Sequence, residues 1–303
     1  DYRSLMVLPL NTQTRGAVGA LTLVRTGAAA PFDEASLLLA QDLSRRCATA
    51  IGKAMLYDEV VRVATVFQKA ALPSALPAVP GISFDAYYEP SSENMLVGGD
   101  WYDAFPLEDG RIAITVGDVL GHGLEAATWM SRLRNGFRAA LFADVSPTRA
   151  LEVVDRMLQV ESREGFTTAV VALVDPIRST LTCASAGHPG PLLWNGSGTI
   201  TDPFEDRGLP LGFRNLGPVR STSQTLDVRA GSFAAFFTDG LLEWNRDIAG
   251  AWKALHTALL RQDIREAAHP AEQLRSAVVT GSGHSDDIAV LTVRWDAMVS
   301  NTA

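Results

Sequence analysis

The chain has 303 residues, with 26 Lys or Arg against 34 Asp or Glu, so its formal net charge is −8. A hydrophobic content of 47% and a charged content of 20% describe a globular chain, and the length favours two domains. The acidic balance without a basic tract argues against nucleic acid as a partner, and no apolar stretch reaches the roughly 18–20 residues of a membrane span. The two cysteines, Cys47 and Cys183, are too few for a disulfide framework, which favours a reducing cytoplasm.

Residues 1–30 contain two apolar runs, at 5–10 and 17–24, separated by a polar turn. This pattern predicts a β-hairpin. Thirty residues cannot bury a core of their own, so we expect the hairpin to pack on another part of the chain.

Residues 31–72 are predicted to form a long linker helix. The segment is rich in helix-forming residues, and Pro31 and Pro73 lie at its two ends with no proline between them. In its second half, apolar residues recur at spacings of 4, 3, 4 and 3: Leu56, Val60, Val63, Phe67 and Ala70. This spacing is typical of a coiled-coil seam, although it lasts only about two heptads. Two interpretations stay open with equal weight: a helix docked on its own domain, and a homodimer joined through the helix.

Three prolines between positions 73 and 81 mark a domain boundary, and we expect one domain over 73–296 with a short tail at 297–303. Strands are predicted at 82–88, 101–105, 111–116, 167–174, 180–186, 191–194, 219–228, 233–238 and 288–295, and helices at 124–142, 148–162 and 270–279. The predicted order begins with strands, continues with two adjacent helices and returns mainly to strands. This order is typical of an α+β fold and not of an alternating α/β fold.

Aspartates adjoin several of these strands: Asp100, Asp118, Asp239 and Asp286. Taken singly, each is explained as a turn residue. If the strands share a sheet, however, the carboxylates converge at its rim, where their repulsion is costly unless a cation neutralises it. Carboxylate sites suit Mg²⁺ or Mn²⁺, and two such ions can hold a water for in-line attack on phosphorus. The pattern therefore predicts a metallophosphatase.

Other catalytic motifs are absent from the sequence. It contains no phosphate-binding loop of the Gly-x-x-x-x-Gly-Lys-[Ser/Thr] type, no Gly-x-Ser-x-Gly elbow and no His-Glu-x-x-His. The glycine-rich loop 117–123 begins with an aspartate-bearing strand end and leads into a predicted helix, so its backbone can approach an anion or a metal closely.

Five motifs carry a resemblance to a known family: Val97-Gly-Gly-Asp-Trp-Tyr-Asp103, Gly117-Asp-Val-Leu-Gly-His-Gly123, Ala186-Gly-His-Pro189, Phe237-Thr-Asp-Gly-Leu241 and Ser285-Asp-Asp-Ile-Ala-Val290. Their order and spacing resemble the metal-dependent protein phosphatase (PPM) superfamily, in the bacterial branch typified by stage II sporulation protein E and the environmental sigma-factor regulators. The resemblance covers about residues 70–296. It implies an α-β-β-α sandwich that holds two Mn²⁺ or Mg²⁺ ions between its sheets and hydrolyses phosphoserine or phosphothreonine in proteins.

The resemblance also implies roles for individual residues. Asp118 would bridge both ions, and the carbonyl of Val119 would complete the coordination of one of them. Asp239 and Asp286 would hold the other ion, and Asp100 would lie at the rim as a direct or water-mediated ligand. Asp118 and Asp239 would act in catalysis through a metal-bound water, by attack of metal-bound hydroxide without a covalent intermediate.

Four further residues near the motifs are expected to play supporting roles. Asp287 is interpreted as a partner of the ligands, Asp103 as structural and His188 as a histidine that fixes its loop. The eukaryotic branch has a histidine where this chain has Leu120, so a general acid is missing there. His122 could replace it, but a helix-capping or packing role is favoured.

The hairpin and linker helix resemble the last third of a GAF sensor domain. The bacterial branch implies a phosphorylated STAS-type anti-anti-sigma protein as substrate. Two alternatives remain: a catalytically weak or inactive phosphatase fold that serves as a signalling scaffold, and a small-molecule phosphoesterase.

Overall fold

The computed structural model describes residues 2–91, 98–161, 165–204, 207–213, 221–281 and 286–296. The chain forms two compact units, Asp1–Ala64 and Thr65–Ala303. The boundary between them falls within the long helix α1 (Glu34–Ala71). No helix in the described ranges combines the length and the apolar character that a membrane crossing requires.

The N-terminal unit consists of a β-hairpin on a helix, and the predicted hairpin is confirmed. Strands β1 (Tyr2–Thr12) and β2 (Gly16–Thr26) pair antiparallel. The helix meets the hairpin through small residues spaced four apart: Ala40, Ser44, Ala48 and Gly52. The Ser44 hydroxyl donates to the carbonyl of Pro9 over 2.8 Å, and a Cβ at Gly52 would lie 3.1 Å from Thr12 Cγ2. Residues four apart share one helix face, so this stripe of small side chains lets the hairpin approach closely.

Helix α1 confirms the helix predicted over 31–72, with slightly shorter bounds. The described side chains of its predicted seam are exposed in the single chain: Leu56 to 64%, Val60 to 52% and Val63 to 57%. An apolar stripe of this kind has no covering partner within the described part of the chain.

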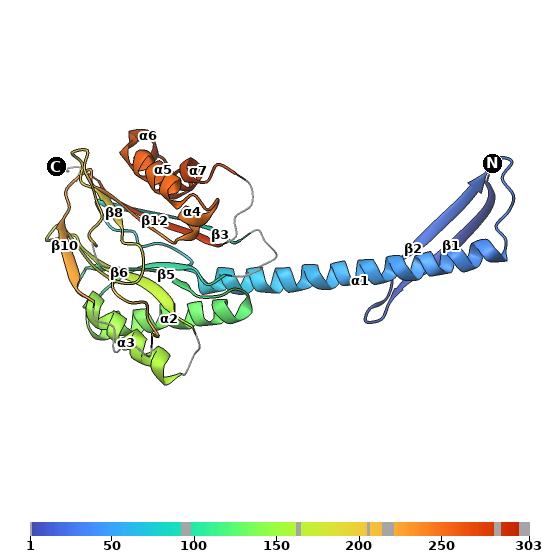
Figure 1. The fold of residues 1–303 in the computed structure, drawn as a ribbon, viewed down its shortest axis with the longest axis horizontal. Helices are drawn as coiled ribbons and strands as arrows, with labels where there is room; N and C mark the ends of the chain where they lie inside the picture. Colours follow the sequence, from blue (N-terminus) through green and yellow to red (C-terminus); the bar gives the residue numbers. More distant parts are fainter. Residues whose placement is uncertain are drawn as a thin grey trace. The chain divides into compact units, whose positions relative to one another are not determined.

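The C-terminal unit contains two five-stranded sheets made of antiparallel pairs (Figure 1). The first has the order β10-β7-β6-β5-β4, with β4 (Trp101–Pro106), β5 (Ile112–Val119), β6 (Thr167–Asp175), β7 (Thr180–Ala186) and β10 (Ser223–Asp227). The second has the order β3-β12-β11-β8-β9, with β3 (Ile82–Glu89), β8 (Leu192–Trp194), β9 (Ile200–Thr201), β11 (Phe233–Phe237) and β12 (Ile288–Trp295).

Helices cover the outer face of each sheet (Figure 1). The first sheet is covered by α2 (Leu124–Ala143) and α3 (Pro147–Val160). The second is covered by α4 (Gly240–Glu243), α5 (Ile248–Leu260), α6 (Gln262–Arg265) and α7 (Pro270–Val278). The unit is therefore the predicted α-β-β-α sandwich.

Strand β5 shows how the sequence builds this sandwich. Ile112, Ile114 and Val116 face the second sheet in the central core, while Ala113 faces the helix layer. Successive side chains of a strand point to opposite faces, so a strand buried on both sides must be apolar at nearly every position. The long apolar runs of the sequence have this cause.

The structure differs from the predicted elements in several places. Strand β5 continues to Val119, three residues beyond its predicted end, so Asp118 lies in the strand and not after it. Helix α5 was not predicted, although Asp247 caps it by accepting from the N–H of Gly250 over 3.0 Å. Its buried residues recur with helical spacing: Ala251, Leu255, Ala258 and Leu259. The predicted strand 219–228 is shorter in the structure, where β10 spans Ser223–Asp227; positions 219 and 220 lie outside the described residues.

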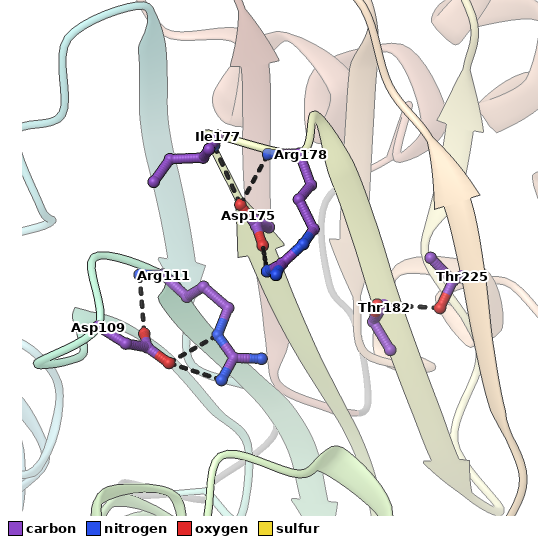
Figure 2. Close-up of polar contacts among 7 residues, drawn as sticks. All are labelled: Asp109, Arg111, Asp175, Ile177, Arg178, Thr182 and Thr225. Carbon is purple, nitrogen blue, oxygen red and sulfur yellow. Dashed lines mark hydrogen bonds and ion pairs between the residues drawn. The ribbon is translucent and has the colours of Figure 1, made fainter.

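Arginines neutralise the aspartates of two turns at one end of the first sheet (Figure 2). Asp109 accepts from the backbone N–H of Arg111 over 3.0 Å and from its Nε over 2.8 Å. Asp175 accepts from the backbone N–H groups of Ile177 and Arg178 and from the Arg178 guanidinium. These hydrogen bonds lower the pKa of both carboxyl groups. Asp109 and Asp175 are therefore structural acids of these turns.

Candidate active site

The predicted metal-binding acids lie at the opposite end of the sandwich. Asp100 immediately precedes β4, and Asp118 pairs with Thr168 near the end of β5. Asp239 follows β11 and begins α4, and Asp286 precedes β12. Asp100 and Asp118 belong to the first sheet and Asp239 and Asp286 to the second, so the acids face one another from two sheets and do not share one rim. Antiparallel neighbours place the start of one strand beside the end of the next, so each sheet contributes a pair of acids at the same end.

Glycines bring the segment before Asp100 against both sheets. The N–H of Val119 donates to the carbonyl of Gly99 over 3.3 Å, and a Cβ on Gly99 would lie 2.3 Å from the Val119 carbonyl oxygen. A Cβ on Gly98 would lie 0.9 Å from Oδ2 of Asp287. Any side chain at either position would displace the neighbouring group, so the Gly-Gly pair permits this close approach. Both glycines belong to the first sequence motif, but no pattern in the sequence predicts these contacts.

Gly240 performs the same function beside Asp239. A Cβ there would lie 2.0 Å from the carbonyl oxygen of Asp287 and 3.4 Å from Cβ of Asp286. The carboxylate of Asp287 is buried and accepts from the N–H of Ser91 over 2.8 Å, whereas Asp286 is exposed and accepts from the N–H of Asp287 over 2.9 Å. Four segments that are distant in the sequence thus meet at one point.

Two of the acids have buried carboxylate oxygens that no hydrogen bond within the described ranges compensates. Asp100 is 1% exposed, and neither of its carboxylate oxygens has a hydrogen-bond partner among the described residues; the same holds for Oδ1 of Asp239. Burial, with repulsion from Asp118 and Asp287, raises the pKa of Asp100 well above its usual range. Burial and repulsion from Asp239 raise the pKa of Asp118 to about 8.

The same causes act on the acids of the second sheet. Burial and repulsion from Asp286 raise the pKa of Asp239 to about 6. Burial raises the pKa of Asp287 as well, although the hydrogen bond from Ser91 opposes the shift. The carboxyl groups therefore interact across the gap between the sheets, and cannot all ionise at neutral pH without a compensating positive charge.

The donor set suits a hard divalent cation. It consists of carboxylates and the Val119 carbonyl, and no Lys or Arg of the described ranges forms an ion pair with Asp100, Asp118 or Asp239. Oxygen ligands of this kind are those that Mg²⁺ and Mn²⁺ prefer. No three His, Cys, Asp or Glu side chains among the described residues are already spaced as ligands of one ion, so the acids converge without forming a closed site.

Asp103 has a structural environment, as expected. Its fully buried carboxylate accepts from Nε and Nη2 of Arg138 over 2.6 and 2.8 Å, and Nε of Arg134 lies 3.3 Å away. Arg134 also donates to the carbonyl of Ala71 at the end of α1. The aspartate therefore joins β4 to α2 and, through Arg134, to the linker helix.

Replacing Asp103 by Asn should destabilise the C-terminal unit by about 3 kcal/mol, since removing one member of a buried ion pair leaves the other uncompensated. Urea unfolding followed by circular dichroism measures this loss. Asp109→Asn, which breaks an exposed pair, should cost only about 0–1 kcal/mol. Equal losses in the two variants would contradict the structural role of Asp103.

The two histidines behave differently. His122 is exposed in the glycine-rich loop, and no hydrogen bond from its side chain is found among the described residues, so the structure supports neither a capping role nor a packing role. His188 is fully buried and bonds to groups of both sheets, which agrees with its predicted role in fixing its loop.

The fold and its acidic end correspond to a known class. The stage II sporulation protein E (SpoIIE) family matches residues 108–296, more than half of the chain. The chain belongs to this family, and the resemblance read from the five motifs is confirmed. The resemblance of the N-terminal unit to a GAF domain stays a prediction.

Curated relatives in Bacillus subtilis include the phosphoserine phosphatases RsbP and RsbU. RsbP is 27% identical over 168 residues, which are 54% of this chain and 40% of RsbP. RsbU is 26% identical over 185 residues, which are 60% of this chain and 53% of RsbU. The chain thus spans about half the length of these relatives or less.

Solved structures share the fold. The RsbU and RsbW domains of a Mycobacterium tuberculosis protein match with a TM-score of 0.64 and 29% identity, covering 76% of this chain and 64% of that one. The SiaA-PP2C domain of Pseudomonas aeruginosa matches with a TM-score of 0.64 and 22% identity, covering 82% of this chain and all of that domain. The C-terminal unit therefore has the fold of PP2C phosphatase domains.

Proposed function

We propose that the chain is a metal-dependent protein-serine/threonine phosphatase that uses two Mn²⁺ or Mg²⁺ ions. The observation that carries this proposal is the group of buried, mutually repelling carboxylates between the two sheets, without an arginine or lysine to neutralise Asp100, Asp118 or Asp239 among the described residues. Structural acids elsewhere in the unit, such as Asp103 and Asp109, are paired with arginines. The names of RsbP and RsbU support the same activity.

Residues of both sheets would bind the cations. The first sheet would contribute Asp118 and the Val119 carbonyl, and the second sheet would contribute Asp239 and Asp286. Asp100 would lie at the rim. When bound, divalent cations supply charge neutralisation for the phosphoryl group and a lowered pKa for the attacking water. Asp287, held by the N–H of Ser91, would keep the segment of Asp286 in place. Glycines 98, 99 and 240 would keep the four segments in contact.

We further propose that the substrate is a phosphorylated regulatory protein, a STAS-type anti-anti-sigma factor, in the cytoplasm. RsbU and RsbW domains occur together in the M. tuberculosis structure, which supports a regulatory protein as partner, and the resemblance to the sigma-factor regulators supports its kind. A small-molecule phosphoesterase and an inactive scaffold are the alternatives. The N-terminal hairpin, with residues 31–72 as linker, would be the end of a GAF-like sensor.

Hydrolysis of a phosphoserine peptide and of p-nitrophenyl phosphate, with Mn²⁺ and with EDTA, tests this function. The proposal predicts Mn²⁺-dependent hydrolysis of both compounds and none with EDTA. Hydrolysis that survives EDTA would overturn the metal requirement. Hydrolysis of p-nitrophenyl phosphate alone would favour the phosphoesterase, and no hydrolysis under any condition would favour the scaffold.

We also propose that the linker helix forms a homodimer seam, because Leu56, Val60 and Val63 expose an apolar stripe at coiled-coil spacing. Val63→Glu should weaken the dimer, since it places charges in the seam. Sedimentation velocity measures the change, with Asp58→Ala, on the same helix outside the seam, as a control. A monomer in the unmodified protein at every concentration would contradict the seam.

A further inference from the structure

His188 joins the two sheets at the acidic end of the sandwich. It follows β7 in the first sheet, and its side chain is completely buried. Its Nδ1 lies 2.8 Å from Oγ1 of Thr168 in β6, and its Nε2 lies 3.2 Å from the carbonyl oxygen of Phe237 at the end of β11. The imidazole therefore spans the sandwich from one sheet to the other.

The hydrogen bonds define one state of the ring. The Phe237 carbonyl can only accept, so Nε2 carries the hydrogen and donates to it. Nδ1 then accepts from the Thr168 hydroxyl. Burial lowers the pKa of His188 to about 3, so the ring is neutral at pH 7 and keeps this tautomer. The backbone is fixed too: the N–H of His188 donates to Oγ of Ser185 over 3.1 Å, and that hydroxyl donates to the His188 carbonyl over 2.8 Å.

Both anchors of the ring adjoin predicted metal ligands. Thr168 is the direct partner of Asp118 in the register of β5 and β6. Phe237 precedes Asp239 by two residues, at the point where β11 ends. A shift of either anchor would change the separation of these two carboxylates, which belong to different sheets.

We infer that His188 is a positioning residue that sets the separation of Asp118 and Asp239 across the sandwich, and so sets the affinity of the site for divalent cations. This inference rests on the proposed function, because it requires that the two acids bind the cations. Removing a group that orients metal ligands without binding the metal itself typically lowers the metal affinity about 10- to 100-fold.

Thr168→Val provides the sharpest test, because it removes the hydroxyl that His188 accepts from while keeping the shape of the side chain. His188→Gln keeps a donor for the Phe237 carbonyl but has no acceptor at the ring position of Nδ1, which faces Thr168. Thr182→Val is the matched control: Thr182 lies in the same sheet, away from the acids, and its hydroxyl bonds to that of Thr225 over 3.0 Å (Figure 2).

Calorimetric titration with Mn²⁺, without substrate, measures the affinity of each protein, and thermal unfolding without metal measures its stability. We expect Thr168→Val and His188→Gln to weaken Mn²⁺ binding about 10-fold or more. Thr182→Val, which also removes a hydroxyl–hydroxyl hydrogen bond of this sheet, should bind Mn²⁺ as the unmodified protein does. Unchanged affinity in Thr168→Val, with the unmodified protein binding Mn²⁺, would overturn the role of His188 and leave the proposed function standing. No Mn²⁺ binding by the unmodified protein would overturn both.

Discussion

Replacing Asp118 by Asn should lower Mn²⁺-dependent hydrolysis of a phosphoserine peptide at least about 10²- to 10³-fold, because several kcal/mol of metal-assisted stabilisation would be lost. Asp118 is the first-sheet acid that three acids of the second sheet repel: Asp239, Asp286 and Asp287. Asn keeps the shape of the side chain and loses its charge, so the sandwich should fold unchanged. Initial rates over a range of Mn²⁺ concentrations measure the effect.

Asp109→Asn is the matched control for this substitution. Asp109 lies in the turn before the same strand, at the opposite end, and its carboxylate bonds to Arg111 (Figure 2). This substitution should leave the rate of peptide hydrolysis within about two-fold of that of the unmodified protein, since an exposed ion pair contributes little to stability. Comparable losses in the two variants, or full activity in Asp118→Asn, would contradict the assigned role of Asp118.

The second large effect concerns the metal-free protein, whose stability should fall as the pH rises from about 4 to 8. The folded protein holds protons on Asp118, whose pKa is raised to about 8, and on Asp239, whose pKa is raised to about 6, while the unfolded chain releases them near pH 4. Folded protein thus binds more protons than unfolded protein across this window. The contribution of these two carboxyl groups to the free energy of unfolding is fully present below their pKa in the unfolded chain. It is lost as the pH rises through their pKa in the folded protein, by up to about 1.4 kcal/mol per pH unit for each proton.

Thermal unfolding in EDTA at several pH values measures this dependence. Asp118→Asn should raise the midpoint of the metal-free protein at pH 7.5, by about 2–4 °C for each kcal/mol regained. Mn²⁺ should raise the midpoint of the unmodified protein and have a smaller effect on the variant. A midpoint in EDTA that rises from pH 5 to 8, or a destabilised Asp118→Asn protein, would show that the acids are not held under mutual repulsion.

Much of the fold could be predicted from the sequence because its signals are local. Long apolar runs such as 169–174 mark strands buried on both faces, and Pro31 and Pro73 delimit the linker helix. Helix α5 was missed although Asp247 and four buried residues carried a helical signal. The end of β5 was misplaced because Gly117 and Asp118 resemble turn residues, and only their pairing with β6 keeps them extended.

The candidate site could be predicted only as a set of residues and not as an arrangement. The sequence indicates the four acids because each adjoins a predicted strand: Asp100, Asp118, Asp239 and Asp286. Their distribution over two sheets depends on strand order. That order arises from packing between distant segments, which local patterns do not encode. The contact of Gly98 with Asp287 and the bond of His188 to Thr168 join positions far apart in the chain, and no spacing in the sequence signals them.

A crystal structure of the protein soaked in Mn²⁺, with anomalous scattering to locate the ions, tests most directly whether these acids form a metal centre. We expect two anomalous peaks between the sheets, within coordination distance of Asp118, the Val119 carbonyl, Asp239 and Asp286. Asp103, Asp109 and Asp175 should show none, because arginines already neutralise them. Saturating Mn²⁺ without any peak between the sheets, or peaks only at other acids, would contradict the metal centre and the phosphatase activity built on it.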